Sequence, residues 1–451
     1  MKIKDIVTLT TTSITPKSSV EYHLYSLPSF DDNQKREELN GSEIQSNKYI
    51  VPDKCILFNK LNVRFKRVWR IDNNDYNKIC STEFLPLVVN ESKVDYQYCY
   101  YILISDYITN YLCGQNANTS GSHKRIDPTN FLNIELPTLP AMEEQKRIGQ
   151  LLFSIDQKIA LNRAINDNLE AMAKQLYDYW FVQFDFPNEE GKPYKSSGGK
   201  MVWNERLNRM IPEGWFSNKL GELIEELESG KRPKGGIDKN LKEGIPSIGA
   251  EAISKLGDFD FSKTPYIPYG TKITSGIVRN NDILVYKDGA YVGKTTIYRD
   301  GFPYNFTTIN EHVFLMRSID PRMQEYLFFT LKKDYFFDIM QNLGKAKAAQ
   351  PGLNQEDLKG IEILFPSKEV VYRFKETTEP LMAMIFNNSK QIERLTKQRD
   401  ELLPLLMNGQ VSVNYHLAHD VLANYTIFAT FVKTIVIYGY TENISVQKHL
   451  C

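Results

Sequence analysis

A long helical pattern occurs twice in this chain, and the two copies lie 226 residues apart. The first copy repeats every seven residues at Ile148, Ile155, Asn162, Leu169 and Leu176. The second copy repeats with the same spacing at Phe374, Leu381, Asn388, Leu395 and Leu402. A seven-residue apolar repeat predicts helices that pack against each other along their length. A chain that repeats such a large unit once is expected to fold into two similar halves.

The regions before each helical copy also resemble one another. KYIVPDKCILF (48–58) aligns with GIVRNNDILVY (276–286) at an offset of 228, and FLNIELP (131–137) aligns with LKGIEILFP (358–366) at an offset of 227. Short runs of β-branched and aromatic residues in both regions are typical of strands. The near-constant offset predicts one fold that is present twice.

These patterns predict an α+β fold class. Two globular domains of the same mixed α/β fold would be joined by two long helices, which form an intramolecular antiparallel coiled coil with pseudo-twofold symmetry. The predicted parts are a first domain (1–139), a first long helix (140–185), a Gly/Pro/Ser-rich linker (186–212), a second domain (213–366), a second helical segment (367–409) and a tail of unknown role (410–451).

Prolines modify the prediction for the second helical segment. An interior proline removes a backbone hydrogen bond and disfavours the helical conformation of the residue before it. Pro380 therefore predicts the start of the main helix or a kink in it, with a short helix before it, and Pro404 predicts a bend or an end, with Gly409 as the final stop.

Composition narrows the class of protein. The chain has 55 basic and 55 acidic residues, so a DNA-binding role would require the charge to be segregated on the surface. The five cysteines form no metal-binding or disulfide pattern, which favours a reduced, cytoplasmic protein. The most apolar stretch, residues 427–438, contains Lys433 and is too short to span a bilayer, so no membrane association is expected.

Asn162 and Asn388 occupy the same step of the two heptad series. A buried asparagine lowers stability and fixes the register of paired helices. We therefore expect these two residues to set the helix register. The alternative is that both are solvent-exposed on amphipathic helices.

Basic residues cluster at different places in the two domains. Residues 54–70 contain six cations and no acid, whereas the equivalent stretch of the second domain contains Lys287 and Lys294 with Asp282 and Asp288. Cations contact phosphates, and Arg suits guanine edges. The candidate DNA-contacting residues are Lys60, Arg64, Lys66, Arg67, Lys124 and Arg125 in the first domain, and Lys231, Arg232, Lys234, Tyr291, Lys294, Lys345, Lys347 and Gln350 in the second. Different surfaces on one scaffold predict that the two domains read different sequences.

Other chemistry has little support in the sequence. Gly289–Lys294 resembles a phosphate-binding loop but has three residues between its glycines where that motif needs four. No catalytic or metal-binding residues are predicted. Two rival hypotheses remain, a single-chain restriction or modification enzyme and a coiled-coil adaptor that does not bind DNA.

Three stretches resemble the DNA-specificity subunit of type I restriction–modification systems. They are residues 136–186 (LPTLPAMEEQKRIGQLLFSIDQ and onward), 195–215 (KSSGGKMVWNERLNRMIPEGW) and 395–413 (LTKQRDELLPLLMNGQVSV). The resemblance implies that each domain reads one half of a split site in double-stranded DNA. It also implies that two methyltransferase subunits dock on the long helices and that restriction and motor subunits join them. The cofactors S-adenosylmethionine, ATP and Mg²⁺ would then belong to those partners and none to this chain.

Overall fold

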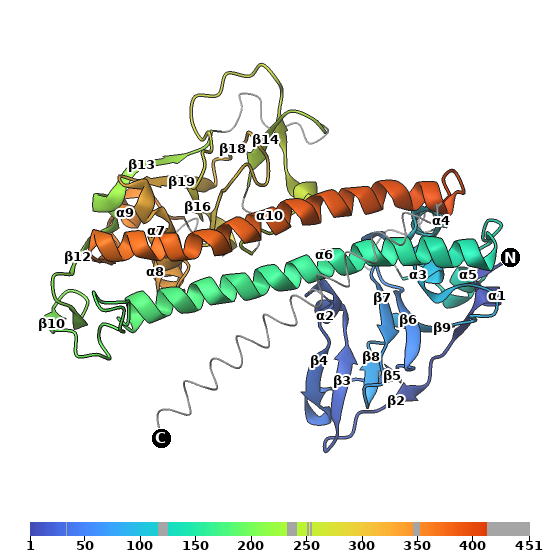
Figure 1. The fold of residues 1–451 in the computed structure, drawn as a ribbon. Helices are drawn as coiled ribbons and strands as arrows, with labels where there is room; N and C mark the ends of the chain where they lie inside the picture. The colour runs from blue at the N-terminus through green and yellow to red at the C-terminus, as the bar shows by residue number, and fades with distance from the viewer. Residues whose placement is uncertain are drawn as a thin grey trace. The chain divides into compact units, whose positions relative to one another are not determined.

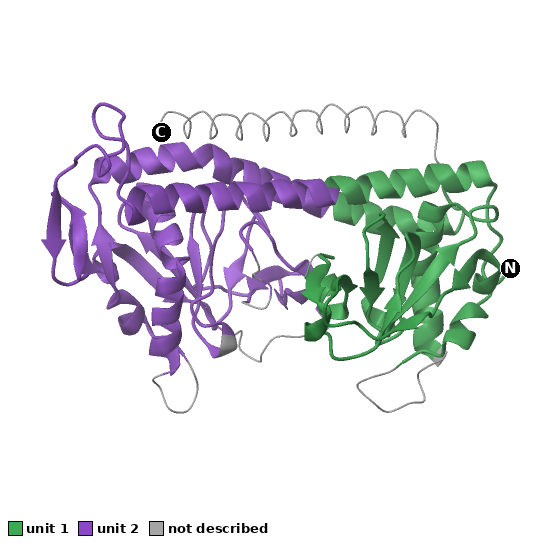
Figure 2. Cartoon of the chain, turned by 90° about the horizontal axis from the view of Figure 1, so that it is seen from below, with its two compact units in different colours: residues 1–158, 395–451 green, residues 159–394 purple. Residues whose placement is uncertain are grey.

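A computed structural model describes residues 1–32, 34–115, 125–231, 241–249, 252, 255–345 and 352–412. The chain divides into two compact units (Figure 2). The first contains residues 1–158 and the chain from Leu395 onward, and the second contains residues 159–394.

The first unit contains two sheets and the helices α1 to α5, which precede the first long helix (Figure 1). Its strands are β1 (Val7–Leu9), β2 (Ser13–Ile14), β3 (Glu21–Tyr25), β4 (Glu37–Asn40), β5 (Lys48–Ile50), β6 (Lys54–Asn59), β7 (Val68–Asp72), β8 (Lys78–Cys80) and β9 (Phe84–Val89). Its main helices are α1 (Ile3–Ile6), α2 (Leu27–Asp31), α3 (Tyr96–Ile104), α4 (Asp106–Gln115) and α5 (Pro128–Leu132). One sheet has the order β1-β9-β6-β7 and the other has the order β2-β5-β8-β3-β4.

The second unit contains the equivalent elements and an additional hairpin. Its strands are β10 (Met201–Asn204), β11 (Arg209–Pro212), β12 (Phe216–Lys219), β13 (Ile224–Ser229), β14 (Ile245–Ile248), β15 (Tyr266–Ile267), β16 (Ile283–Tyr286), β17 (Thr295–Ile297), β18 (Thr308–Ile309), β19 (Val313–Ser318) and β20 (Glu362–Phe365). Its shorter helices are α7 (Gln324–Leu331), α8 (Asp334–Lys345) and α9 (Gln355–Lys359).

The two domains share one strand topology, which confirms the predicted duplication. The sheet order β13-β19-β16-β17 matches β1-β9-β6-β7, and every pair in both sheets is antiparallel. In the smaller sheets, β14 pairs parallel with β18 as β3 pairs parallel with β8. The helices α3, α4 and α5 are followed at nearly the same offset by α7, α8 and α9.

Each central strand is buried on both faces, which explains its continuous apolar sequence. In β6, Ile56 and Phe58 face the helices, while Cys55 and Leu57 face the second sheet. Successive strand residues point to opposite faces, so an uninterrupted apolar run buries both.

The long helices α6 (Met142–Tyr177) and α10 (Lys368–Met407) run antiparallel within each unit. In the second unit, Asn166 of α6 contacts Ser389 of α10. Tyr177, about three turns further along α6, packs against Phe374 of α10. In the first unit, Asp156 pairs with Arg399 at 3.0 Å. The antiparallel pairing predicted from the heptads is therefore confirmed.

Asn162 and Asn388 are both buried, and each donates a hydrogen bond to the opposite helix. They do not bond to each other. Asn162 Nδ2 donates to Gln391 Oε1 at 3.3 Å, and Asn388 Nδ2 donates to Asn166 Oδ1 at 3.0 Å. Asn166 also donates to the carbonyl of Ile385 at 3.2 Å. The solvent-exposed alternative is wrong, and the role of these residues in register stays a prediction.

The prediction that the main helix starts at Pro380 after a separate short helix is wrong, because α10 is a single helix of 40 residues that includes Pro380. An interior proline costs about 3 kcal/mol. Phe374, Met382 and Ile385 around it are fully buried, and burying each such side chain stabilises the fold by about 1.5–3 kcal/mol. Pro404 is also within the helix, which ends at Met407 before Gly409, whose φ is 67°.

The segment 186–212, predicted to be a linker, is folded. It contains the β10–β11 hairpin, and Met201, Val202 and Leu207 pack against the core of the second unit. Asp185, immediately before it, is buried and accepts hydrogen bonds from the amide and hydroxyl of Ser196 at 2.7 and 2.6 Å. Turn-forming residues here therefore shape a compact hairpin instead of a flexible connection.

A buried arginine ties the second domain to its long helix. Arg299 follows β17, and its side chain is 4% exposed. Its guanidinium donates to Glu325 of α7 at 2.8 Å and pairs with Glu379 of α10. Burial raises the pKa of Glu325, and the hydrogen bond from Thr378 and the charge of Arg299 oppose that rise.

Arg70 of β7 makes the equivalent contacts in the first domain. It donates to Gln97 of α3 at 2.9 Å and lies 3.6 Å from Asp156 of α6. Its guanidinium also lies 4.4 Å from the centre of the Phe153 ring. Each domain thus uses an arginine in or just after the strand that follows its central strand to contact a domain helix and a long helix, although the two arginines are not at equivalent positions.

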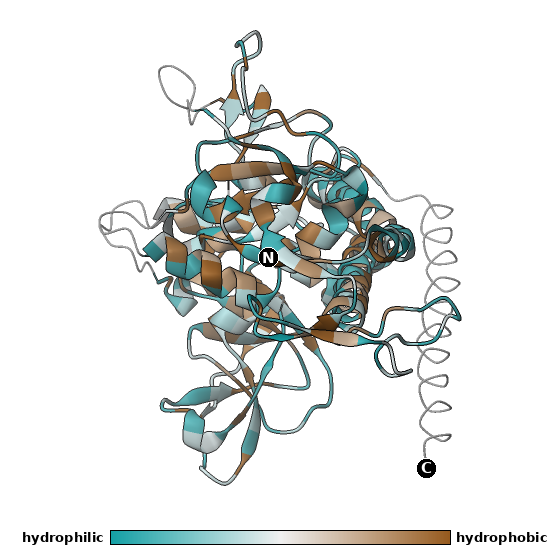
Figure 3. Ribbon diagram, turned by 90° about the vertical axis from the view of Figure 1, so that its left-hand side faces the viewer, coloured by the Kyte–Doolittle hydropathy of each residue, from teal (hydrophilic) through white to brown (hydrophobic). Residues whose placement is uncertain are grey.

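No helix among the described residues is long and apolar enough to cross a membrane. The long helices, seen nearly end-on, carry both hydrophilic and hydrophobic residues (Figure 3).

Candidate nucleic-acid interface

The turn between β6 and β7, here called tip 1 (residues 60–67), carries four of the predicted DNA-contacting residues. The amide of Asn59 donates to the carbonyl of Arg67 at 3.0 Å and closes the turn. Asn62 and Lys66 have φ values of 52° and 47°. This left-handed conformation costs a non-glycine residue roughly 1–2 kcal/mol. The turn is therefore held in a defined shape at an energetic cost.

The turn between β16 and β17, here called tip 2 (residues 287–294), has the same construction. The amide of Tyr286 donates to the carbonyl of Lys294 at 2.9 Å. The left-handed positions are Gly289 and Gly293, with φ values of 78° and 86°. The predicted exclusion of a phosphate-binding loop agrees with this geometry, because β17 and not a helix follows the glycines.

Each tip is also bonded to the chain that precedes α5 or α9. Ile126 donates to the carbonyl of Lys60 at 2.9 Å, and Leu353 donates to the carbonyl of Lys287 at 2.7 Å. Both residues of the second pair lie 227 positions after those of the first. The closing bonds and the left-handed residues of the two tips are separated by the same offset, so the tips can be compared residue by residue.

Several basic residues of the first domain form ion pairs that their local sequence does not indicate. Their acidic partners come from distant parts of the chain. The pairs are Arg67 with Asp31 at 2.7 Å, Lys66 with Asp106 at 2.6 Å and Arg125 with Glu83 at 2.8 Å. Residues 54–70 themselves contain no acid, and these partner acids come from α2, α4 and the turn before β9.

Arg64 differs from these residues. It is exposed and, within the described parts of the chain, makes no ion pair. Its guanidinium carbon lies 4.8 Å from the centre of the Phe65 ring, and that of Arg67 lies 4.9 Å from the same ring. Phe65, which was not predicted from the sequence, is 53% exposed.

In the second domain, Tyr291 is 58% exposed at tip 2. Its ring centre lies 6.1 Å from that of Tyr286 and 5.5 Å from Lys294 Nζ. Burial lowers the pKa of Lys294, and the nearby charge of Lys263 lowers it further. Lys231 and Lys345 are exposed, and the structure brings neither of them into contact with tip 2 through a described hydrogen bond or ion pair.

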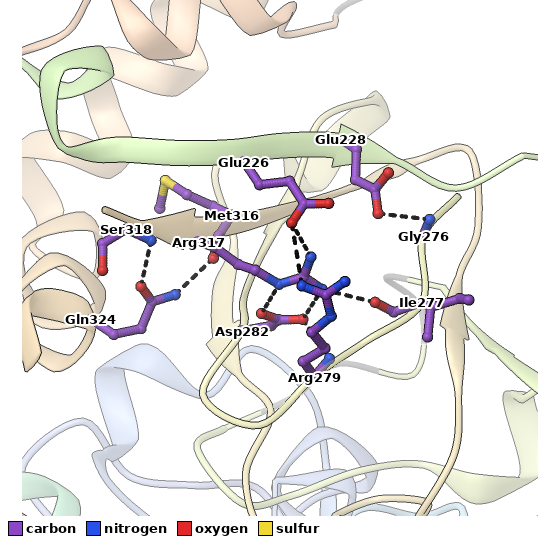
Figure 4. Close-up of polar contacts among 10 residues, drawn as sticks. All are labelled: Glu226, Glu228, Gly276, Ile277, Arg279, Asp282, Met316, Arg317, Ser318 and Gln324. Atoms are coloured by element: carbon purple, nitrogen blue, oxygen red, sulfur yellow. Dashed lines mark hydrogen bonds and ion pairs between the residues drawn. The ribbon is translucent and has the colours of Figure 1, made fainter. Parts of the chain in front are cut away.

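The acids of the second domain's central sheet are occupied internally (Figure 4). Asp282 is buried and accepts from Arg317 at 2.7 and 2.8 Å. Arg317 also pairs with Glu226, and Arg279 lies 3.7 Å from that carboxylate. Burial raises the pKa of Asp282, while the hydrogen bond from Arg317 opposes the rise. This cluster joins β13, β19 and the segment before β16, so Asp282 does not place a negative charge on the tip surface.

Five predicted contacts, Lys124, Arg232, Lys234, Lys347 and Gln350, lie outside the described residues. Among the described residues, no group of three or more His, Cys, Asp or Glu side chains could hold a metal ion.

The family model of the type I restriction modification DNA specificity domain matches residues 1–171 and 212–397. The chain belongs to this family. The two matches to the specificity family cover the two domains with most of their long helices. Membership gives the chain a non-catalytic role in DNA specificity.

Curated specificity subunits are similar to this family member over most of its length. The MjaIX specificity subunit of Methanocaldococcus jannaschii is 24% identical over 349 residues, covering 75% of this chain and 74% of that protein. The HindI specificity subunit of Haemophilus influenzae is 26% identical over 408 residues, covering 79% and 86%. The crystal structure of the S subunit from M. genitalium has a TM-score of 0.55 at 15% identity, covering 90% of this chain and 95% of that one, and so shares its fold.

Proposed function

We propose that this specificity protein binds a bipartite, asymmetric DNA site in which each domain reads one half and the bases between them are not read. The observation that carries the proposal is the pair of equivalent tips with different side chains. Arg64 in tip 1 corresponds to Tyr291 in tip 2, and Arg67 corresponds to Lys294. One backbone frame that presents different hydrogen-bonding groups favours different base sequences in the two half-sites.

The proposed partners follow from family membership. The chain would act in the cytoplasm with two methyltransferase subunits bound along α6 and α10, and with restriction and motor subunits in the full complex. S-adenosylmethionine, ATP and Mg²⁺ would be bound by those subunits. The named relatives are specificity subunits of type I restriction enzymes, which supports an assembly of this kind.

The remaining candidate contacts complete the proposed interface. Lys60, Lys66 and Arg125 would contact phosphates after exchanging their present carboxylate partners where they have one, whereas Arg67 would stay paired with Asp31. Such exposed ion pairs contribute about 0–1 kcal/mol each, so exchange for a phosphate costs little. Lys231, Lys294 and Lys345 would have the same role in the second domain.

The test is a selection of duplexes from a randomised library by the full-length chain. We expect a motif with two different short halves separated by a gap of fixed length. A single continuous motif would contradict the bipartite proposal. Absence of any DNA retention at low salt would instead support an adaptor that does not bind DNA.

A further inference from the structure

Arg64 and Tyr291 occupy the same position in the two tips. Each lies two residues after the first left-handed residue and two before the second, between Asn62 and Lys66 in tip 1 and between Gly289 and Gly293 in tip 2. The equivalent closing bonds at both tips support this alignment. The duplicated frame therefore presents one exposed side chain at the same place in each domain.

Neighbouring side chains hold this position in tip 1. Both oxygens of Asp31 accept from Arg67 at 2.7 Å, which immobilises its guanidinium. The ring of Phe65 contacts the guanidinium groups of both Arg67 and Arg64. Arg67 is thus a support, and Arg64 is the member of the stack with its hydrogen-bond donors unused by any described residue.

A similar support exists in tip 2. Tyr291 packs edge-on against Tyr286, with an interplanar angle of 70°, and Lys294 lies over its ring. Its hydroxyl makes no hydrogen bond to a described residue. Side chains that are oriented before binding lose less conformational freedom on contact with a ligand.

We infer that Arg64 and Tyr291 are equivalent base-reading residues and that each determines specificity in a different half of the site. Arg64 can donate two parallel hydrogen bonds to the O6 and N7 atoms of guanine. Tyr291 offers a single hydroxyl and an apolar ring, which suits a single base-edge hydrogen bond or a thymine methyl group. The first domain's half-site should therefore contain a guanine that depends on Arg64. This inference rests on the proposed function.

The experiment compares full-length variants in the duplex selection. Arg64→Tyr should change the preferred base in one half-site only and weaken binding to the original site by roughly 5- to 150-fold, the range for loss of a good bidentate contact. Tyr291→Arg should change the other half only. Arg64→Lys keeps the charge and can still donate to O6 and N7, so it should weaken but not abolish the guanine preference, whereas Arg64→Met removes every donor and should abolish it.

Arg206→Tyr is the matched control, because Arg206 is exposed in the turn of the β10–β11 hairpin and outside both tips. It should leave the motif unchanged. If Arg64→Met keeps the guanine preference, Arg64 does not read that base and the inference fails. It also fails if both tip variants alter the same half or neither does. Failure of the unmodified chain to select two half-sites would overturn the proposed function instead.

Discussion

Arg299 illustrates how much a single buried charge depends on its partners. Its neighbour Glu325 is 1% exposed and accepts from Arg299 and from the hydroxyl of Thr378. Removing one partner of a buried ion pair leaves an uncompensated charge, which is far more costly than the net stabilisation of the pair. Arg299 is therefore important for stability even if the pair itself contributes little.

Arg299→Met should lower the free energy of unfolding by about 3–5 kcal/mol at pH 7. The loss should be smaller at acidic pH. Burial already raises the pKa of Glu325 above its ordinary value of 4.5, so the folded state favours the protonated form. A carboxyl whose pKa is higher in the folded state stabilises that state by binding its proton. For Glu325 this contribution is complete below the pKa of the unfolded state and is lost as the pH rises through the pKa of the folded state. Urea titrations at pH 5 and pH 7 measure the difference.

Arg70→Met is the matched control for this measurement. Arg70 donates to the neutral Gln97. Its acidic neighbour Asp156 would still have two partners in the variant, Arg399 at 3.0 Å and the hydroxyl of Tyr101 at 2.5 Å. The control should cost less and depend less on pH. Equal losses in both variants at both pH values would show that packing, and not a stranded carboxylate, accounts for the effect.

At the scale of helices, the interface between α6 and α10 contains a polar group that the heptad positions did not indicate. Asn166 bonds to Asn388, Ser389 and the carbonyl of Ile385. It lies four residues after Asn162 and hence on the same face of the helix. That spacing was the signal that could have identified it from the sequence.

Asn166→Leu should lower the free energy of unfolding by about 1–3 kcal/mol, because the buried amide of Asn388 loses its acceptor. The double variant Asn166→Leu with Asn388→Leu should recover most of that loss. Asn162→Leu is the control, since its bond to Gln391 is only partly buried. Additive losses in the double variant would argue against coupling between the two asparagines.

The sequence predicted the existence and pairing of the long helices well, because a periodic apolar pattern over many turns has few other structural solutions. It failed where tertiary packing overrides local preference. Pro380 remains within α10 because buried neighbours hold the helix together. The segment 186–212 folds because its few apolar residues reach the core of the second unit, which composition alone does not reveal.

The candidate interface was predicted in part. The sequence identified the basic stretch of tip 1, but could not show that Asp31 and Asp106 pair with it or that Glu83 pairs with Arg125. Each acid lies 36 to 42 positions along the chain from its partner, so only the fold brings the two together. Phe65 was missed because one exposed aromatic residue has no periodic signature.

For the whole molecule, duplication is the feature that links fold and function. Topology, closing hydrogen bonds and left-handed residues repeat, whereas the side chains at the tips differ. A scaffold that repeats while its exposed side chains differ is expected for two domains that read different sequences.

Replacement of residues 1–139 by a second copy of residues 213–366 tests this account most directly. Duplex selection with the resulting full-length chain should yield a site in which one original half is lost and a second copy of the remaining half replaces it. An unchanged motif, or a change in both original halves, would contradict the assignment of one half-site to each domain.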